Sequence, residues 1–216
     1  MKVDIHESLL LRNQTAAEHN RSHFARRGVF CVNLMGSPGS GKTALLEATG
    51  RALAGRRTLA AMSGDLATDH DAQRLTAAGI PSCAITTGSA CHLDADLVHT
   101  ALHELNREFS MLFIENVGNL VCPAIYDLGQ ARNVVALSVT EGEDKPLKYP
   151  VMFRNADLVV ITKIDLLPHL PRVDVGVIQS ALERVMARPR FMKVSAETGE
   201  GMSAWFDWLS SAELNP

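Results

Sequence analysis

Residues 36–43 match the G-x-x-x-x-G-K-[ST] pattern of a phosphate-binding loop. Glycines let the backbone bend until successive N–H groups point at phosphate oxygens, and the helix that follows adds its positive N-terminal end. The pattern assigns Lys42 to the β- and γ-phosphates and Thr43 to Mg²⁺. The chain is therefore expected to bind a nucleoside triphosphate through Gly36, Ser37, Pro38, Gly39, Ser40, Gly41, Lys42 and Thr43.

A second pattern, T-K-x-D at residues 162–165, indicates which base is bound. The Asp165 carboxylate can accept hydrogen bonds from both the ring N–H and the exocyclic amine of guanine, a pair of donors that adenine lacks. The stem of Lys163 can lie over the purine face, and Thr162 replaces the more usual asparagine. Ser195 and Ala196 resemble the S-A element whose backbone closes over the guanine O6. These elements predict a preference for GTP and GDP, against the alternative of two ordinary strand-to-helix loops.

Two carboxylates are expected to sense the γ-phosphate. Glu115 and Gly118 occupy the place where many GTPases carry D-x-x-G, so Glu115 is expected to hold Mg²⁺ and Gly118 to turn its N–H toward the γ-phosphate. Asp65 follows another expected strand and is predicted to bind Mg²⁺ or position the attacking water. Lys42, Asp65 and Glu115 form the expected catalytic set. Because no arginine finger or catalytic glutamine is evident, we expect slow hydrolysis that self-association accelerates.

Three soft or borderline donors indicate a possible transition-metal site. Cys91 and His92 are adjacent, and Cys122 follows Glu115 by seven residues. Thiolate and imidazole suit Ni²⁺ or Zn²⁺ better than Mg²⁺. Three ligands leave a tetrahedral site incomplete unless water or a second subunit helps, and a two-fold dimer would bring both copies to one interface. Spacing alone leaves open the alternative of buried thiols and a helix-start histidine.

Two further pairs of histidines are spaced four residues apart, His19 with His23 and His99 with His103. On a helix this spacing places both imidazoles on one face, where they could bind a metal. Neither pair has carboxylate or cysteine neighbours of clear purpose. Both pairs are therefore interpreted as solvated helix residues.

The elements that must position these residues alternate between short apolar runs and longer helical patterns. This alternation is typical of a parallel sheet covered on both faces, and it predicts a three-layer α/β fold of the P-loop NTPase type. The expected strands are 30–35, 58–63, 82–86, 111–115, 134–140, 158–162 and 190–194. The expected helices are 42–54, 71–78, 94–107, 175–187 and 202–211.

Length and composition limit the remaining possibilities. A chain of 216 residues fits one α/β domain, which we place at 29–216, preceded by an amphipathic helical extension at 1–28. The extension is expected to pack on the domain or on a second copy, in preference to acting as a docking arm. A net charge of −3 argues against nucleic acid as a partner. The absence of a long apolar run argues against a membrane, so a cytoplasmic protein with reduced thiols is expected.

Six segments together resemble the HypB family, the nickel-incorporation GTPases of hydrogenase maturation. They are GSPGSGKT, SGDLATDHDA, GSACHLDA, IENVGNLVCPA, EGEDKPLKYP and ITKIDLLP, in that order. The likeness runs from about residue 28 to the C-terminus. It implies a GTPase of the dimerising SIMIBI class, related to the signal-recognition-particle, MinD and urease-accessory proteins.

The resemblance also implies a Ni²⁺ or Zn²⁺ site at the dimer interface, built from Cys91, His92 and Cys122 and governed by the nucleotide. It implies that Lys148 reaches the nucleotide of a partner subunit. The implied partners are a HypA-like maturation protein and a hydrogenase large subunit. Residues 1–28 lack the cysteine-rich motif or histidine-rich tract of some members, so high-affinity nickel storage is not expected there.

Two other functions stay open from sequence alone. A urease-type accessory GTPase typically carries a Cys-Pro-His element, whereas Cys91 and His92 are contiguous here. A nucleotide-gated switch without metal transfer would instead dock an assembly factor through residues 1–28. Metal binding separates the switch from the metallochaperone.

Overall fold

The computed structural model describes residues 5–88, 90–105 and 107–214. Its strands form one sheet in the order β3-β2-β4-β1-β5-β6-β7, and every strand pairing in it is parallel. This confirms the predicted α/β fold. The strands are β1 (Phe30–Met35), β2 (Leu59–Asp65), β3 (Ser82–Thr86), β4 (Met111–Glu115), β5 (Arg132–Ser138), β6 (Leu158–Thr162) and β7 (Phe191–Lys193).

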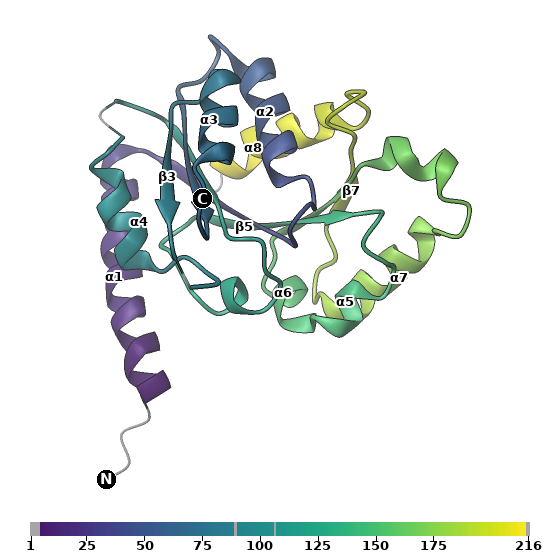
Figure 1. The fold of residues 1–216 in the computed structure, drawn as a ribbon, viewed down its shortest axis with the longest axis horizontal. Helices are drawn as coiled ribbons and strands as arrows, with labels where there is room; N and C mark the ends of the chain where they lie inside the picture. The colour runs from purple at the N-terminus through teal and green to yellow at the C-terminus, as the bar shows by residue number, and fades with distance from the viewer. Residues whose placement is uncertain (1–4, 89, 106, 215–216) are drawn as a thin grey trace.

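Helices cover both faces of the sheet (Figure 1). One face carries α2 (Lys42–Leu53), α3 (His70–Ala77) and α8 (Met202–Leu214). The opposite face carries α1 (Ile5–Arg27), α4 (Ala95–Leu102), α5 (Lys145–Lys148), α6 (Pro150–Arg154) and α7 (Val175–Val185). Two short 3₁₀ segments, η1 (Cys122–Ala124) and η2 (Ile164–His169), lie in the loops that follow β4 and β6.

The central strands are buried on both faces because helices pack on each side. Every residue of β1, β4 and β6 is buried, as expected for continuous apolar runs in a parallel sheet. On one face Leu45, Leu46 and Trp205 are fully buried against the sheet. The indole N–H of Trp205 donates to the Thr49 hydroxyl at 2.9 Å, so its one polar atom is satisfied. This packing fixes α2, and with it the loop that precedes α2.

Element boundaries differ from the expected ones in several places. The helix expected at 94–107 ends at Leu102, since the next turns bury Leu105 and Phe109 as the chain returns to β4. The strand expected at 58–63 continues to Asp65, the strand expected at 134–140 is Arg132–Ser138, and the last strand is Phe191–Lys193. The short elements η1, α5, α6 and η2 were not predicted, because segments of three to six residues carry no measurable hydrophobic period.

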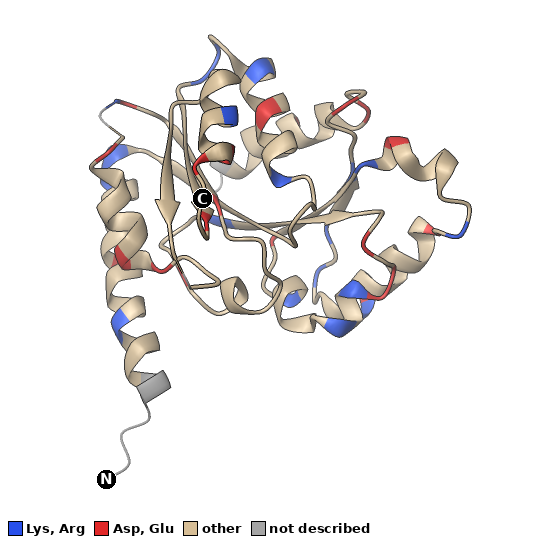
Figure 2. Cartoon of the chain, in the orientation of Figure 1, with Lys and Arg blue, Asp and Glu red and all other residues tan. Residues whose placement is uncertain are grey.

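Helix α1 lies along α4 (Figure 1). Ala17 and Asn20 are fully buried in this contact, and Phe24 enters the core beneath the sheet. Residues 1–4 of the expected extension lie outside the described residues. Figure 2 shows acidic and basic positions interspersed along the helices of both layers. No helix in the described part of the chain has the length and apolar character needed to cross a bilayer.

Candidate functional site

The phosphate loop joins β1 to α2, and its backbone requires glycine. Gly36, Gly39 and Gly41 have φ angles of +151°, +74° and +89°. A Cβ atom on Gly36 would lie 2.5 Å from the carbonyl oxygen of Ala136, so no larger residue fits there. The loop therefore has the conformation that lets backbone N–H groups face a bound anion.

Lys42 begins α2 and turns back over the loop. Its ammonium donates to the carbonyl oxygens of Gly36, at 3.4 Å, and Ser37, at 3.2 Å. The side chain is buried, and burial lowers the pKa of Lys42, although nearby Glu115 opposes that change. A buried cation that carbonyl oxygens hold beside the phosphate loop is well placed to bind phosphate oxygens.

Thr43 and Glu115 form the oxygen-donor pair expected for Mg²⁺. The Thr43 hydroxyl donates to Glu115 Oε1 at 2.7 Å, across the loop-to-β4 contact. Glu115 is 3% exposed, and its Oε2 atom has no hydrogen-bond partner among the described residues. Burial raises the pKa of Glu115 to about 7, against the opposing effects of Lys42 and Thr43. A buried carboxylate oxygen without a partner beside a hydroxyl fits a hard divalent cation.

Asp65 ends β2 and lines the same cavity, which has a volume of about 500 Å³ and also contacts Lys42 and Glu115. Its Oδ1 accepts the backbone N–H groups of Ala67 and Thr68, both at 2.9 Å. These hydrogen bonds lower the pKa of Asp65, so it stays ionised near neutral pH. Asp65 thus presents an ionised carboxylate beside the phosphate loop.

Gly118 follows β4 and touches the phosphate loop directly. A Cβ atom at this position would lie 2.8 Å from the backbone nitrogen of Pro38. The β4-to-η1 segment can approach the loop this closely only with glycine at this position. Gly118 therefore packs directly against the phosphate loop.

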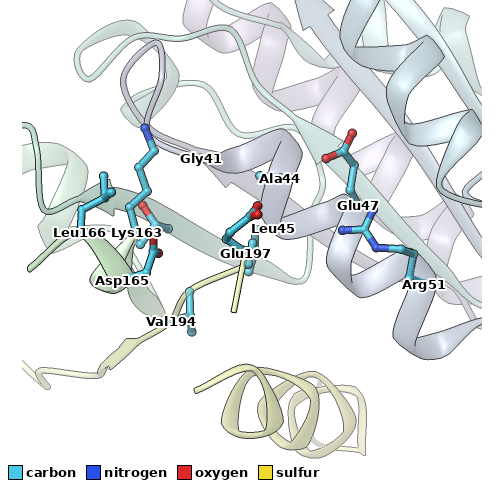
Figure 3. Close-up of a pocket in the computed structure, with 12 residues that line it drawn as sticks. Gly41, Ala44, Leu45, Glu47, Arg51, Lys163, Asp165, Leu166, Val194 and Glu197 are labelled. Carbon is cyan, nitrogen blue, oxygen red and sulfur yellow. The ribbon is translucent and has the colours of Figure 1, made fainter. Parts of the chain in front are cut away.

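The expected base-binding elements line a cavity of about 280 Å³ next to the phosphate loop. Figure 3 shows Lys163 and Asp165 on one side of this cavity and Glu47 and Arg51 of α2 on the other. Val194, Ala196 and Glu197 from the loop after β7 close a further wall.

Hydrogen bonds join the base-binding elements to the phosphate loop. The Thr162 hydroxyl donates to the Ser40 carbonyl at 2.6 Å, and the Lys163 ammonium donates to the Gly39 carbonyl at 2.7 Å. Lys163 has a φ of +60°, which among the described residues is the one positive φ outside glycine. Such strain is typical of functional sites, because the surrounding contacts must maintain it. In the second loop, the buried Ser195 hydroxyl accepts the N–H of Thr198 at 3.0 Å.

The three soft donors converge on one point. The sulfurs of Cys91 and Cys122 lie 2.9 Å apart, and His92 Nδ1 lies 3.9 Å from the Cys91 sulfur. Among the described residues, these three form the one group of histidine, cysteine or acidic side chains whose ligand atoms all lie within 4.8 Å of one another. Burial lowers the pKa of His92, which favours the neutral, metal-binding imidazole. The group has three ligands, as a site open to a fourth would.

Asn119 connects this cluster to the phosphate loop, a role that the sequence did not reveal. Its backbone N–H donates to the Gly36 carbonyl at 3.1 Å, and its side-chain amide donates to the Cys91 carbonyl at 3.3 Å. Its Oδ1 accepts the N–H of Val121, beside Cys122, at 2.8 Å. One asparagine thus touches the loop and both segments that carry the soft donors.

Helix α1 also contacts the two segments that carry the soft donors, close after Cys91–His92 and close after Cys122. Asn13 donates to the Asp127 carbonyl at 2.8 Å and accepts the N–H of Ala95 at 2.9 Å. Asn20 donates to the carbonyls of Ala95, at 2.8 Å, and Leu128, at 3.2 Å. The ring of His92 stacks on Tyr126 from the second segment, with centroids 3.8 Å apart. Such long-range contacts leave no local pattern in the sequence.

Lys148 lies away from both cavities of its own chain. It is exposed on α5 and pairs with Asp144 at 2.6 Å, and that ion pair raises the pKa of Lys148. The lining residues of the phosphate and base cavities do not include it.

Three features lie together at the carboxyl edge of the parallel sheet: the phosphate loop, the adjoining base cavity and the buried pair of Thr43 and Glu115. Together they define a P-loop nucleotide-binding protein. Residues 30–193 match the family described as "CobW/HypB/UreG, nucleotide-binding domain". Hydrogenase maturation factor HypB of Azotobacter vinelandii is 52% identical over 206 residues, covering 95% of this chain and 68% of that protein. The chain belongs to the HypB family of hydrogenase maturation factors, which confirms the resemblance seen in its motifs.

Two solved structures agree with this assignment. HypB from Helicobacter pylori, crystallised in complex with nickel, has a TM-score of 0.89 and 35% identity, with 94% of this chain and 96% of that chain covered. HypB from Archaeoglobus fulgidus has a TM-score of 0.87 and 38% identity, with 94% and 99% covered.

Proposed function

We propose that this protein is a GTP-hydrolysing nickel metallochaperone that assists nickel insertion during [NiFe]-hydrogenase maturation. The observation that carries the proposal is the contact of Asn119 with both the Gly36 carbonyl and the Cys91 carbonyl. Through this contact, a loop that responds to phosphate shares a hydrogen-bonded residue with a soft-donor cluster. Metal affinity therefore depends on which nucleotide is bound.

The guanine base occupies the cavity beside Asp165, and the phosphates lie along residues 36–43. Lys42 neutralises charge on the β- and γ-phosphates, and Gly118 donates its N–H toward the γ-phosphate. Water attacks the γ-phosphorus in line, a new P–O bond forms, and the bond to the β-phosphate oxygen breaks to give GDP and phosphate. Asp65, ionised at the cavity edge, orients the water.

Thr43 and Glu115 are the residues that would hold Mg²⁺, with Asp65 nearby. Their fit to a hard cation rests on the Glu115 oxygen that has no hydrogen-bond partner among the described residues. Mg²⁺ would supply charge neutralisation on the transferred phosphoryl group. The hydrogen bond between Thr43 and Glu115 would have to open for both oxygens to hold the ion.

A second copy of the chain completes the metal site in our proposal. Cys91, His92 and Cys122 are half-buried and offer three ligands, which supports recruitment of further donors. The large apolar side chains Val121 and Ile125 are 58% and 45% exposed on either side of Cys122. Exposed apolar residues around an incomplete site support a nucleotide-dependent homodimer. In that dimer Lys148 reaches the partner's nucleotide.

Nickel is the proposed cargo, because a relative with 35% identity was crystallised with nickel and the donor set suits that ion. Zinc binds the same donors and is the expected competitor. The proposed recipients are a HypA-like maturation protein and the hydrogenase large subunit. HypB relatives described as hydrogenase maturation factors support that client.

Equilibrium dialysis with Ni²⁺ and with Zn²⁺ tests the proposal, with GDP or a non-hydrolysable GTP analogue and Mg²⁺. We expect the analogue to change metal affinity by roughly tenfold. We expect Cys91→Ala and Cys122→Ala to abolish this nucleotide-sensitive binding. The matched control is Cys83→Ala, which removes a half-buried thiol outside the cluster. Metal binding that ignores both the nucleotide and the two cysteines would instead favour a protein-binding switch.

A further inference from the structure

The fold brings together the two histidine pairs that lie far apart in the sequence. His19 and His23 lie on α1, and His99 lies on the facing α4, with His103 at its C-terminal end. The ring centroids of His19 and His99 are 4.8 Å apart, and those of His99 and His103 are 5.3 Å apart. Both contacts are edge-to-face, with interplanar angles of 88° and 86°. The helix-face spacing of each pair thus becomes a cluster across the α1–α4 contact.

Two nitrogens in this cluster have no hydrogen-bond partner among the described residues. They are Nε2 of His23 and Nδ1 of His99, and both atoms are buried. A buried imidazole nitrogen without a partner forfeits a hydrogen bond that water would supply, so its presence calls for an explanation. The interpretation from sequence, solvated helix residues, agrees with the exposed His19 and His103 but not with these two buried nitrogens.

We propose that His19, His23, His99 and His103 form a second transition-metal site, separate from the cysteine-containing cluster. A nitrogen-to-metal distance of about 2.0–2.1 Å places imidazole centroids that share one tetrahedral ion about 5 Å apart. The centroid distances of His19 to His99 and of His99 to His103 match that spacing, and the buried Nε2 atom of His23 is the candidate for the remaining ligand. Imidazole donors suit Ni²⁺ and Zn²⁺, and an all-nitrogen set excludes the softest ions that thiolates select.

Binding requires the rings to turn. In the described part of the chain, no three nitrogens of the cluster lie within 4.8 Å of one another, as they must around an ion. His19 and His103 are exposed and free to change rotamer, whereas His23 and His99 are half-buried and set the position of the ion. The packing of α1 on α4 therefore already brings the imidazole rings close together, and rotation of their side chains would complete the site.

The guanidinium groups of Arg26 and Arg27 act on His23. Burial lowers the pKa of His23, and the guanidinium groups of Arg27 and Arg26 lower it further. The same guanidinium groups repel a cation, so an affinity below that of a thiolate site is expected.

The location gives the site a mechanical consequence. An ion at this site would crosslink α1 to α4, the two helices whose contact also holds Ala95, just after the Cys91–Asp94 segment. This crosslink would restrain α4, and through Ala95 the segment that carries Cys91 and His92. This site does not depend on the proposed GTP cycle.

The test uses the full chain carrying Cys91→Ser and Cys122→Ser, so that the cysteine-containing cluster binds no metal. Co²⁺ is the spectroscopic probe and Ni²⁺ the ion for equilibrium dialysis. We expect one ion per chain and visible cobalt d–d bands without a thiolate charge-transfer band. Adding His99→Ala or His19→Ala is expected to weaken Ni²⁺ binding by about tenfold or more. His169→Ala, which removes an exposed histidine of η2, is the matched control and leaves binding unchanged.

Because His99 is half-buried, His103→Ala provides an exposed second variant, and circular dichroism verifies that each variant is folded. Equal weakening by His103→Ala supports the shared site. The proposal is overturned if the Cys91→Ser/Cys122→Ser protein binds no Ni²⁺ or Co²⁺. It is also overturned if His19→Ala and His103→Ala bind as tightly as His169→Ala. Neither result bears on nucleotide-gated binding at the cysteines, which the earlier dialysis measures.

Discussion

Asp165 carries the proposed selectivity for guanine through two hydrogen bonds from one carboxylate. Asp165→Asn replaces an acceptor oxygen with a donor, which repels one guanine N–H but matches the carbonyl that xanthine has in that place. We expect GTP affinity to fall by roughly a hundredfold or more, since hydrogen bonds to charged groups contribute about 1.5–3 kcal/mol each. Xanthosine triphosphate should gain affinity. Competition between the two nucleotides measures the change.

The control for this variant is Asp207→Asn, on the exposed face of α8, which should leave base selectivity unaltered. If Asp165→Asn still prefers GTP to the same degree, another residue of the cavity reads the base.

The buried carboxylate of Glu115 is expected to lower the free energy of unfolding when it is ionised. Its pKa rises from 4.5 to about 7 in the folded protein, so the folded state keeps a proton that the unfolded chain releases. The stabilising contribution is complete below about pH 4.5 and is lost as the pH rises to about 7, a change of roughly 3 kcal/mol. Glu115→Gln should therefore unfold at higher urea than the parent at pH 8, and should lose Mg²⁺-dependent hydrolysis.

Urea unfolding at pH 5 and pH 8 measures this difference, with Glu183→Gln on the exposed face of α7 as the matched control. Parallel pH profiles for Glu115→Gln and the parent would show that Glu115 is ionised in the folded protein throughout.

At the scale of elements, the segment between β4 and η1 is proposed to couple nucleotide binding to metal binding. Asn119→Ala removes the amide that reaches the Cys91 carbonyl but keeps the backbone bond to Gly36. We expect nickel affinity with GDP to change less than threefold, while its response to a GTP analogue falls from roughly tenfold toward none. Dialysis in both nucleotide states measures the coupling. The control is Gln73→Ala, which removes an exposed amide of α3 and should retain the effect of the nucleotide on nickel affinity. If Asn119→Ala also retained this effect, the coupling would not pass through Asn119.

The elements that could be predicted from sequence are those with a local period. Apolar runs located the strands, and the glycine-lysine pattern located the phosphate loop, because both patterns are contiguous in the chain. Asn119 and Asn20 act through partners up to 108 residues away, so no window of sequence contains their contacts. The histidine pairs show the same limit, because the four-residue spacing is local but the α1–α4 contact is not. Pairs interpreted as solvated form a cluster once the helices meet.

At the scale of the whole molecule, the surface around the soft-donor cluster has exposed apolar side chains and a metal site with three ligands. The soft donors, Val121 and Ile125 share one segment, and their apolar side chains are exposed there. Lys148 lies outside its own nucleotide cavities. In the proposed dimer a second copy would cover the apolar side chains, and a two-fold axis through the soft-donor cluster would supply further ligands to the metal site.

A nucleotide-gated dimer has a direct test at Val121. The non-hydrolysable GTP analogue with Mg²⁺ should convert the parent from monomer to dimer, and Val121→Asp should prevent this by burying a charge in an apolar contact. We expect at least a tenfold weaker dimer, measured by analytical ultracentrifugation, with GTP affinity of the monomer unchanged. Val177→Asp is the matched control, since Val177 on α7 is 47% exposed and lies outside the cluster. A Val121→Asp protein that dimerises as the parent does would place the contact on another face, and the metal would then have to find its further ligands within one chain or in water.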